Sequence, residues 1–357
     1  MNEKIPVNLI TGFLGVGKTT ALLKLLADKP ADEYWAVIVN EFGEVGIDGA
    51  TLSGDGGDDV RVAEVPGGCI CCTTSPMLRV ALGKIARPGK EGQRPDRLLI
   101  EPSGLGHPAG IVDLLRDPMV AGAYALRAVV TLLDPRHLDD ARYNSHQTWR
   151  DQIELADVLV INKGDLADAE QVDRAHALAD ALFPPKLAVV DAYKGAFDPA
   201  LLDLTLDEAR WPQQPQAHVH SGNAVLQPRR RTTEAVAEAS TQWPLRKTQS
   251  SLGSHSCGWI LPPETLFHSA KLADLFERLG DPAAYGLAGL SRAKGVFQTE
   301  RDWYRFDWVD GMAGAAVSAY RRDNRFEVIV EAATPPDWAA LEQALLAAAI
   351  NFSAGSP

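Results

Sequence analysis

The chain has 357 residues, of which 46% are hydrophobic and 23% are charged, proportions typical of a soluble globular protein. Its formal net charge of −12 arises almost entirely in the first 210 residues, which argues against a surface that neutralises nucleic-acid phosphates. No apolar run approaches the ~20 residues of a membrane span and no secretory cleavage site follows the apolar start. We therefore expect a cytoplasmic protein with reduced cysteines that binds neither membrane nor nucleic acid.

Short apolar runs alternate with helical patterns in the first part of the chain. The runs predict strands at 5–11, 35–39, 60–65, 97–101, 127–133, 157–161 and 187–191. Helices are predicted at 18–28, 76–87, 108–116, 145–156 and 168–182. This alternation is typical of an α/β fold with a mostly parallel sheet covered on both faces.

The rhythm breaks at residues 211–254, where Pro, Gln, Ser and Thr predominate, as in a linker. A smaller α+β pattern follows, with strands at 257–261, 293–298, 303–309, 314–319 and 326–332 and helices at 264–279 and from Pro336. We therefore predict a P-loop domain at 1–210, a linker at 211–254 and an α+β domain at 255–352.

Residues Gly12–Thr19 match G-x-x-x-x-G-K-[ST] between a predicted strand and a predicted helix. The glycines let backbone N–H groups face the β-phosphate, and Lys18 bridges the β- and γ-phosphates in catalysis. The Thr19 hydroxyl is the expected ligand of Mg²⁺. The predicted phosphate-binding residues are Gly12, Gly15, Gly17, Lys18, Thr19 and Thr20.

Glu101 ends an apolar strand, at the Walker B position, where an acid can hold Mg²⁺ through water and contribute to catalysis. Gly104 can offer its N–H to the γ-phosphate. A solvated acid at a strand end is the alternative for Glu101.

Asn162-Lys163-Gly164-Asp165 follows another predicted strand and suits guanine. The Asp165 carboxylate can accept hydrogen bonds from guanine N1–H and the 2-amino group, donors that adenine lacks. Asn162 can reach the other edge of the base, and the Lys163 stem can lie over the ring. A polar turn is the alternative; a P-loop kinase would leave the motif without a purpose.

Three of the four cysteines, Cys69, Cys71 and Cys72, follow two glycines, so their thiolates can converge on one metal ion. Zn²⁺ suits such ligands, with Cu(I) and Co²⁺ also compatible. A C-x-x-C redox pair and inert buried cysteines stay open as alternatives.

Taken together, these motifs resemble the CobW-type family of P-loop GTPases, GTP-driven metal chaperones. The segments that carry the likeness are Gly12–Thr19, Asn40–Glu44, Gly67–Cys72, Glu101–Gly104 and Asn162–Asp165. The resemblance implies a GTPase domain followed by a smaller α+β domain, and slow GTP hydrolysis linked to metal handling.

The resemblance also places Glu41 and Glu44 in a switch segment near Mg²⁺ and the thiolates, with Glu44 a candidate metal ligand. Many relatives carry an acid where this chain has Val39, and a His-rich linker where it has His218 and His220. The roles of these histidines, of His255 with Cys257, and of His107 beside the Walker B segment stay open.

These inferences lead to a GTP-hydrolysing metallochaperone that uses GTP and Mg²⁺ and delivers zinc, or alternatively cobalt, to a client metalloprotein. One alternative is a GTPase maturation factor that inserts cobalt, nickel or iron into a specific enzyme or cofactor. Another is a regulatory GTP-binding module with structural cysteines. The sequence leaves open the physiological metal, the client, the oligomeric state and the residue that positions the hydrolytic water.

Overall fold

The computed structural model describes residues 3–39, 60–65, 76–88, 92–204, 244–251 and 253–352. They form two compact units. The first contains the described residues up to Leu182 and from Lys186 to 204, and the second is built chiefly from residues 244–352. Within the described residues, no helix is long and apolar enough to cross a lipid bilayer.

The first unit is built on a seven-stranded sheet in the order β3-β2-β4-β1-β5-β6-β7, with every neighbouring pair parallel. The strands are β1 (Ile5–Gly12), β2 (Trp35–Val39), β3 (Val60–Glu64), β4 (Arg97–Glu101), β5 (Tyr124–Leu133), β6 (Val158–Asn162) and β7 (Ala188–Ala192). All seven coincide with predicted strands within a few residues.

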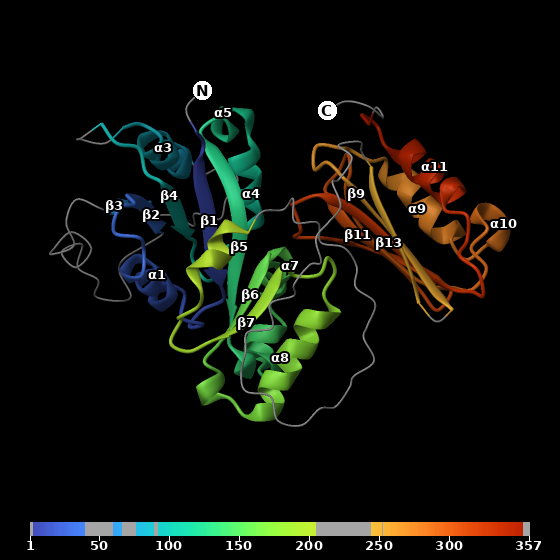
Figure 1. The fold of residues 1–357 in the computed structure, drawn as a ribbon, viewed down its shortest axis with the longest axis horizontal. Helices are drawn as coiled ribbons and strands as arrows, with labels where there is room; N and C mark the ends of the chain where they lie inside the picture. Colours follow the sequence, from blue (N-terminus) through green and yellow to red (C-terminus); the bar gives the residue numbers. More distant parts are fainter. Residues whose placement is uncertain are drawn as a thin grey trace. The chain divides into compact units, whose positions relative to one another are not determined.

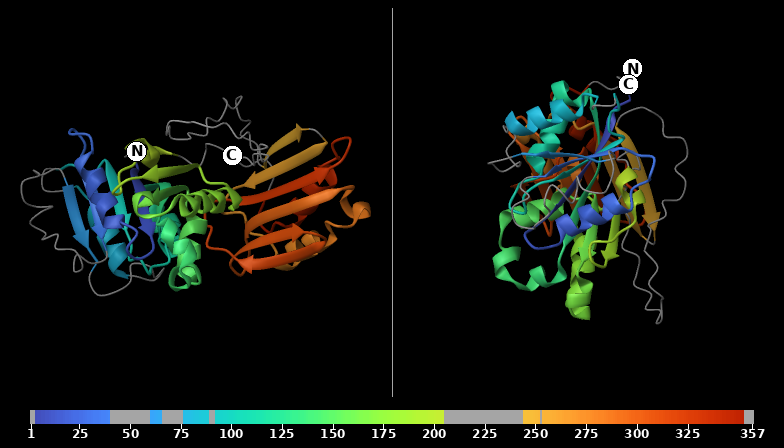
Figure 2. Two further views of the ribbon diagram at one scale, coloured as in Figure 1. Left: turned by 90° about the horizontal axis from the view of Figure 1, so that it is seen from below. Right: turned by 90° about the vertical axis from the view of Figure 1, so that its left-hand side faces the viewer.

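Helices cover both faces of this sheet (Figures 1 and 2). The longer ones are α1 (Lys18–Ala27), α3 (Pro76–Ile85), α4 (Ala109–Arg116), α7 (Gln147–Leu155) and α8 (Ala169–Ala181). The short ones are α5 (Pro118–Ala121), α6 (Ala141–Asn144), η1 (Pro135–Asp139), η2 (Gly164–Leu166) and η3 (Pro199–Asp203).

Two apolar cores hold the helices to the sheet. Ile10 packs with Leu22 and Leu25 of α1 in one core, and Leu9 packs with Leu82 of α3 in the other. Strands buried on both faces are apolar throughout rather than alternating, which is why the sequence shows continuous apolar runs here.

The second unit has a six-stranded antiparallel sheet in the order β12-β11-β10-β13-β9-β8. Its strands are β8 (Leu245–Ser251), β9 (Ser254–Leu261), β10 (Leu290–Gln298), β11 (Trp303–Val309), β12 (Met312–Val317) and β13 (Asn324–Glu331). The helices α9 (Ser269–Arg278) and α11 (Ala339–Ala348) pack on it through Phe276 and Leu345, and α10 (Pro282–Tyr285) completes the unit. The prediction of a P-loop domain with a mostly parallel sheet and a smaller C-terminal α+β domain is confirmed.

Strand β8 corrects one detail, because it lies inside the stretch 211–254 that the composition indicated as linker. After Leu245 the strand is polar, so it carries no apolar pattern. It is an edge strand held by backbone pairing with β9, from Leu245 opposite Ile260 to Ser251 opposite Ser254. The domain limits themselves stay a prediction.

Candidate nucleotide site

The candidate site lies at the carboxyl edge of the parallel sheet. Gly12 ends β1 and opens the phosphate loop, Glu101 ends β4, Asn162 ends β6, and Asp134 comes directly after β5. Because β1 pairs with both β4 and β5, these ends are neighbours. The strands β4 and β5 follow one another in the chain but lie on opposite sides of β1 in the sheet. Parallel sheets bind ligands at the carboxyl ends of the strands beside such a topological switch point.

Two positions of the phosphate loop favour glycine for both conformational and steric reasons. Gly12 has φ +137° and a Cβ there would lie 2.5 Å from the Leu132 carbonyl oxygen. Gly17 has φ +100° and a Cβ there would lie 2.7 Å from Nδ2 of Asn162. Side chains at these positions would meet both backbone strain and a clash. The loop therefore turns tightly into α1, which begins at Lys18 and points its N-terminal N–H groups toward the loop.

The structure brings Lys18, Thr19 and Glu101 together. Nζ of Lys18, which is 9% exposed, donates to the Phe13 carbonyl at 3.1 Å. The Thr19 hydroxyl donates to Oε1 of Glu101 at 2.8 Å. Burial lowers the pKa of Lys18, although the charge of Glu101 opposes that shift. Burial likewise raises the pKa of Glu101, against the Thr19 hydrogen bond and the Lys18 charge. Thr20 is exposed on α1.

These groups fit a magnesium ion. Mg²⁺ prefers hard oxygen ligands and often keeps several waters. The Thr19 hydroxyl donates a hydrogen bond to Glu101, so the lone pairs of its oxygen stay available to a cation. Because the pKa of the buried Glu101 stays raised despite the Thr19 hydrogen bond and the Lys18 charge, a further cation beside the carboxylate would stabilise its charged form.

The segment after Glu101 contacts the phosphate loop and is fastened by α7. A Cβ on Gly104 would lie 2.9 Å from the Leu14 nitrogen, so glycine permits this close approach. Nε2 of Gln152 donates to the carbonyls of Gly104 and Gly106, each at 3.0 Å. The sequence did not indicate Gln152, because no motif in α7 predicts its contact with the Gly104 segment.

His107 is also held by α7 rather than left free. Its Nδ1 lies 3.0 Å from Oδ2 of Asp151, and its Nε2 lies 3.1 Å from Oγ1 of Thr148. These two contacts anchor the His107 ring to α7.

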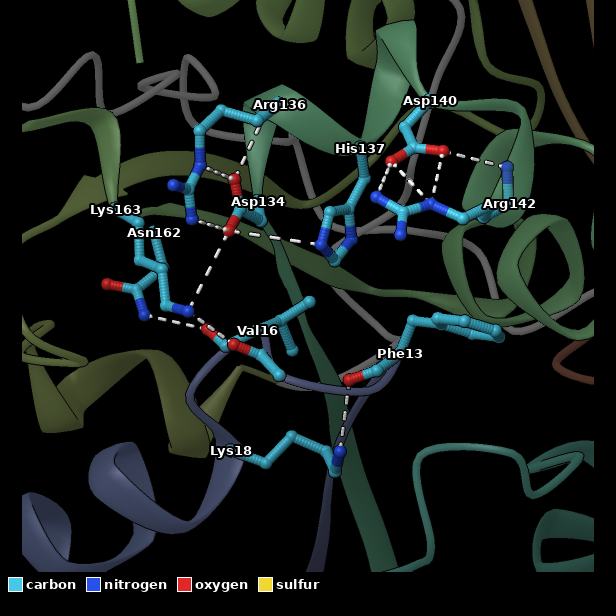
Figure 3. A network of polar contacts seen from close by, with 11 residues as sticks. Phe13, Val16, Lys18, Asp134, Arg136, His137, Asp140, Arg142, Asn162 and Lys163 are labelled. Carbon is cyan, nitrogen blue, oxygen red and sulfur yellow. Dashed lines mark hydrogen bonds and ion pairs between the residues drawn. The ribbon is translucent and has the colours of Figure 1, made fainter. Parts of the chain in front are cut away.

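Asn162 ties the phosphate loop to the turn after β7. Its Nδ2 donates to the Val16 carbonyl at 2.9 Å, as Figure 3 shows, and its Oδ1 accepts from the Gly195 nitrogen at 3.0 Å. Asn162 is 2% exposed. Lys194 and Gly195 both have positive φ, as a tight turn of this kind requires. The sequence did not single out this turn, which the structure adds to the site.

Lys163 adopts the left-handed conformation, with φ +62°, and its Nζ donates to the Gly15 carbonyl. Asp165 is exposed in η2. In the segment predicted to bind the base, the Asp165 carboxylate is therefore open to solvent, while Asn162 and Lys163 hydrogen-bond to the phosphate loop.

The predicted metal ligands Cys69, Cys71, Cys72 and Glu44, together with Glu41, His218 and His220, lie outside the described residues. Before the cysteines, the described residues end at Val65, directly after β3. The Val65 nitrogen donates to the Val39 carbonyl at 3.2 Å. Within the described part of the chain, no group of three or more His, Cys, Asp and Glu side chains could hold a metal ion.

Cys257 and His255 have structural roles in the second unit. Cys257 is fully buried in the core, and burial raises the pKa of its thiol to about 12. Nδ1 of His255 lies 2.8 Å from the Ser250 hydroxyl, and Nε2 lies 3.1 Å from the Ala332 carbonyl. The Cys257 thiol therefore packs as an apolar side chain in this core.

A parallel sheet with a phosphate loop after its first strand, an acid beside the loop threonine and a polar loop after β6 defines a P-loop nucleotide-binding protein. Residues 6–189 match the family CobW/HypB/UreG, nucleotide-binding domain, and the chain belongs to this family.

Several known proteins are similar to the chain. The zinc chaperone YeiR of Escherichia coli is 37% identical over 340 residues, which cover 95% of this chain and 96% of that protein. The zinc chaperone CobW of Pseudomonas aeruginosa is 34% identical over 61% of this chain and 64% of its own length. The zinc-regulated GTPase metalloprotein activator 1 of Schizosaccharomyces pombe is 30% identical over 47% of this chain and 41% of its own length.

Proposed function

We propose that the protein is a GTP-hydrolysing metallochaperone that carries zinc on Cys69, Cys71 and Cys72 and passes it to a client protein. The observation that carries the proposal is the similarity along 95% of the chain to a zinc chaperone, YeiR. The thiolate-rich segment between β3 and α3 supports zinc as the cargo, because three sulfur ligands leave a fourth position for an incoming acceptor. Glu44 is a further candidate ligand.

The nucleotide part of the proposal follows from the site. Lys18 leaves the Phe13 carbonyl to bridge the β- and γ-phosphates, and Gly104 offers its N–H to the γ-phosphate. Thr19 would hold Mg²⁺ through its hydroxyl, and Glu101 would hold it through water. When bound, the ion neutralises charge that develops on the phosphates. Asp165 accepts from the guanine edge and so selects GTP over ATP.

Coupling between metal and nucleotide is the functional core of the proposal. Gly104 lies in the segment that follows β4 and approaches Leu14 closely, so a γ-phosphate contact at Gly104 would act on this segment and on the phosphate loop together. The described end of β3 lies at the same sheet edge, since Val39 of β2 stands opposite both Glu64 and Glu101. If GTP tightens metal binding, metal must tighten GTP binding by the same factor.

The test is a titration of the purified protein with Zn²⁺ in the presence of GTP, GDP or neither, paired with GTP titrations with and without Zn²⁺. We expect tight zinc binding that depends on the nucleotide, and an equal factor in the reciprocal titration. Zinc that stays bound with one affinity throughout turnover would instead indicate structural cysteines in a regulatory module. The same titration with Co²⁺ decides between the two metals.

A further inference from the structure

A buried carboxylate lies beside the proposed base loop. The Asp134 side chain, 1% exposed, follows β5 and caps η1 by accepting from the Arg136 nitrogen at 3.1 Å. The Arg136 guanidinium completes a two-point pair with the same carboxylate, at 2.9 Å and 2.7 Å. Burial acts to raise the pKa of Asp134, but the hydrogen bonds from Arg136 hold it below its ordinary value, so the carboxylate stays charged.

The chain repeats this arrangement at the next turn. Asp140 caps α6 by accepting from the Arg142 nitrogen at 2.9 Å, and its carboxylate pairs with the Arg142 guanidinium at 3.0 Å and 2.5 Å. The two Asp-x-Arg caps have the same local chemistry, and Figure 3 shows them side by side. They differ in surroundings, because the Asp140 side chain is 27% exposed. Capping therefore explains Asp140 fully, but it does not explain why Asp134 is buried.

The Asp134 carboxylate has two further neighbours, Lys163 and His137, and Nε2 of His137 lies 3.9 Å from Oδ2 of Asp134. Nζ of Lys163 lies 3.8 Å from Oδ2 of Asp134 and donates to the Gly15 carbonyl of the phosphate loop (Figure 3). Its backbone is held at φ +62°, a conformation that costs a side-chain-bearing residue free energy. The ammonium is thus fixed between two acceptors, one on each side, and the alkyl stem runs between the end of β6 and the phosphate loop.

We propose that Asp134 is a positioning residue for purine binding: its carboxylate holds the Lys163 side chain in place so that the stem is ready to lie against the base. This inference rests on the proposed nucleotide function and names a residue that supports it. Without the carboxylate, the lysine keeps one anchor, the Gly15 carbonyl, and its stem must be ordered when the nucleotide binds. Side-chain ordering at the moment of binding lowers affinity.

The experiment compares Asp134→Asn with the matched control Asp140→Asn. Asparagine caps helices about as well as aspartate, so both variants keep the cap and lose one charge. Affinities for GDP and for inorganic tripolyphosphate, which has no base, are measured by calorimetry on the full chain. Lys163→Met and the double variant Asp134→Asn with Lys163→Met complete a cycle that isolates the coupling between the two residues.

We expect Asp134→Asn to weaken GDP binding about fivefold, the size of one partly buried ion pair, and to leave tripolyphosphate binding unchanged. Asp140→Asn should bind both ligands as the parent does, and the double variant should bind GDP no more weakly than Lys163→Met. An unchanged affinity of Asp134→Asn for GDP, or an equal loss for tripolyphosphate, overturns the inference. If the parent protein itself binds ADP as tightly as GDP, the proposed guanine function fails instead.

Discussion

The side chains of the candidate site hold one another before any nucleotide is present. Lys18 rests on the Phe13 carbonyl, Thr19 on Glu101, and Lys163 on the Gly15 carbonyl. At Lys18 and Thr19, binding of the phosphates or Mg²⁺ would exchange one partner for another rather than order a free side chain. At Lys163 the existing contact restrains the stem that we expect to lie over the base. Such preorganisation lowers the entropic cost of binding.

Glu101→Gln tests the metal part of this arrangement. The amide keeps an acceptor for the Thr19 hydroxyl but loses the charge that attracts Mg²⁺. We expect Mg²⁺-dependent GTP hydrolysis to fall about 10- to 100-fold, while GDP binding without Mg²⁺ is retained. Single-turnover hydrolysis across a Mg²⁺ titration measures the effect. Asp28→Asn, which removes an exposed carboxylate paired with Lys24, is the control, and equal losses in the two variants would contradict the assignment.

Gly104→Ala tests the close approach to the phosphate loop. The new methyl group would meet the Leu14 nitrogen at 2.9 Å and its Cα at 3.0 Å, and the backbone cannot yield cheaply. We expect a loss of about 1–3 kcal/mol in the free energy of unfolding and weaker GTP binding, measured by denaturant titration and calorimetry.

Gly83→Ala is the matched control for that variant. Gly83 lies within α3, where a Cβ meets nothing within 4 Å. Alanine there should stabilise the helix by about 0.5–1 kcal/mol. If both alanine variants changed stability in the same direction, the contact between Gly104 and Leu14 would not be the cause.

At the scale of elements, helix α7 organises the site from behind. Its Gln152 fastens the Gly104 segment, and its Thr148 and Asp151 hold His107. The C-terminal end of α7 is capped in turn by Lys186, whose Nζ donates to the carbonyls of Glu154 and Ala156 at 2.8 Å and 2.9 Å. The stability of this end of the helix thus depends on a buried amine.

The capping amine predicts a pH dependence of stability. Burial lowers the pKa of Lys186 from 10.5 to about 7, with the charge of Glu154 opposing. Between pH 7 and 10.5 the unfolded amine is protonated while the native amine is neutral, so the unfolded state binds more protons and stability rises with pH. The slope is at most about 1.4 kcal/mol per pH unit, and below pH 7 it vanishes.

The prediction is checked by urea unfolding of the parent and of Lys186→Met between pH 7 and 10.5. Methionine has no titratable group, so the rise of stability with pH should disappear in this variant. Lys29→Met is the matched control, since Lys29 also donates to two carbonyls, those of Pro30 and Glu33, but at the surface. A slope that survives in Lys186→Met would assign the effect to another group.

At the scale of the whole molecule, the two units have separate apolar cores. The parallel sheet is stabilised by two clusters that flank it, and the antiparallel sheet by a third that contains Trp259, Phe276 and Phe326. The candidate nucleotide site draws all its described residues from the first unit.

This separation predicts where a nucleotide acts. GDP at 100 times its dissociation constant should stabilise the unit that binds it by about 2.7 kcal/mol. Hydrogen exchange should show added protection for amides of β1, β4 and β6 and unchanged rates for β9 and β13. Equal protection in both sheets would contradict a site confined to the first unit.

The strands of the parallel sheet and the phosphate loop could be predicted from the sequence alone. Continuous apolar runs follow from strands buried on two faces, and the glycines follow from backbone conformations that other residues resist, as at Gly12 and Gly17. Both signals are local, so they are visible in short stretches of the sequence.

The contacts between residues far apart in the chain became visible only in the folded protein. Gln152 and Gly104, or Asp134 and Lys163, meet because strands far apart in sequence end at one sheet edge. Likewise β8 is a strand because its backbone pairs with β9, although its side chains carry no apolar pattern. Partners brought together by folding leave no periodic trace in the sequence, since hydrogen bonds and ion pairs depend on position in space and not on spacing along the chain.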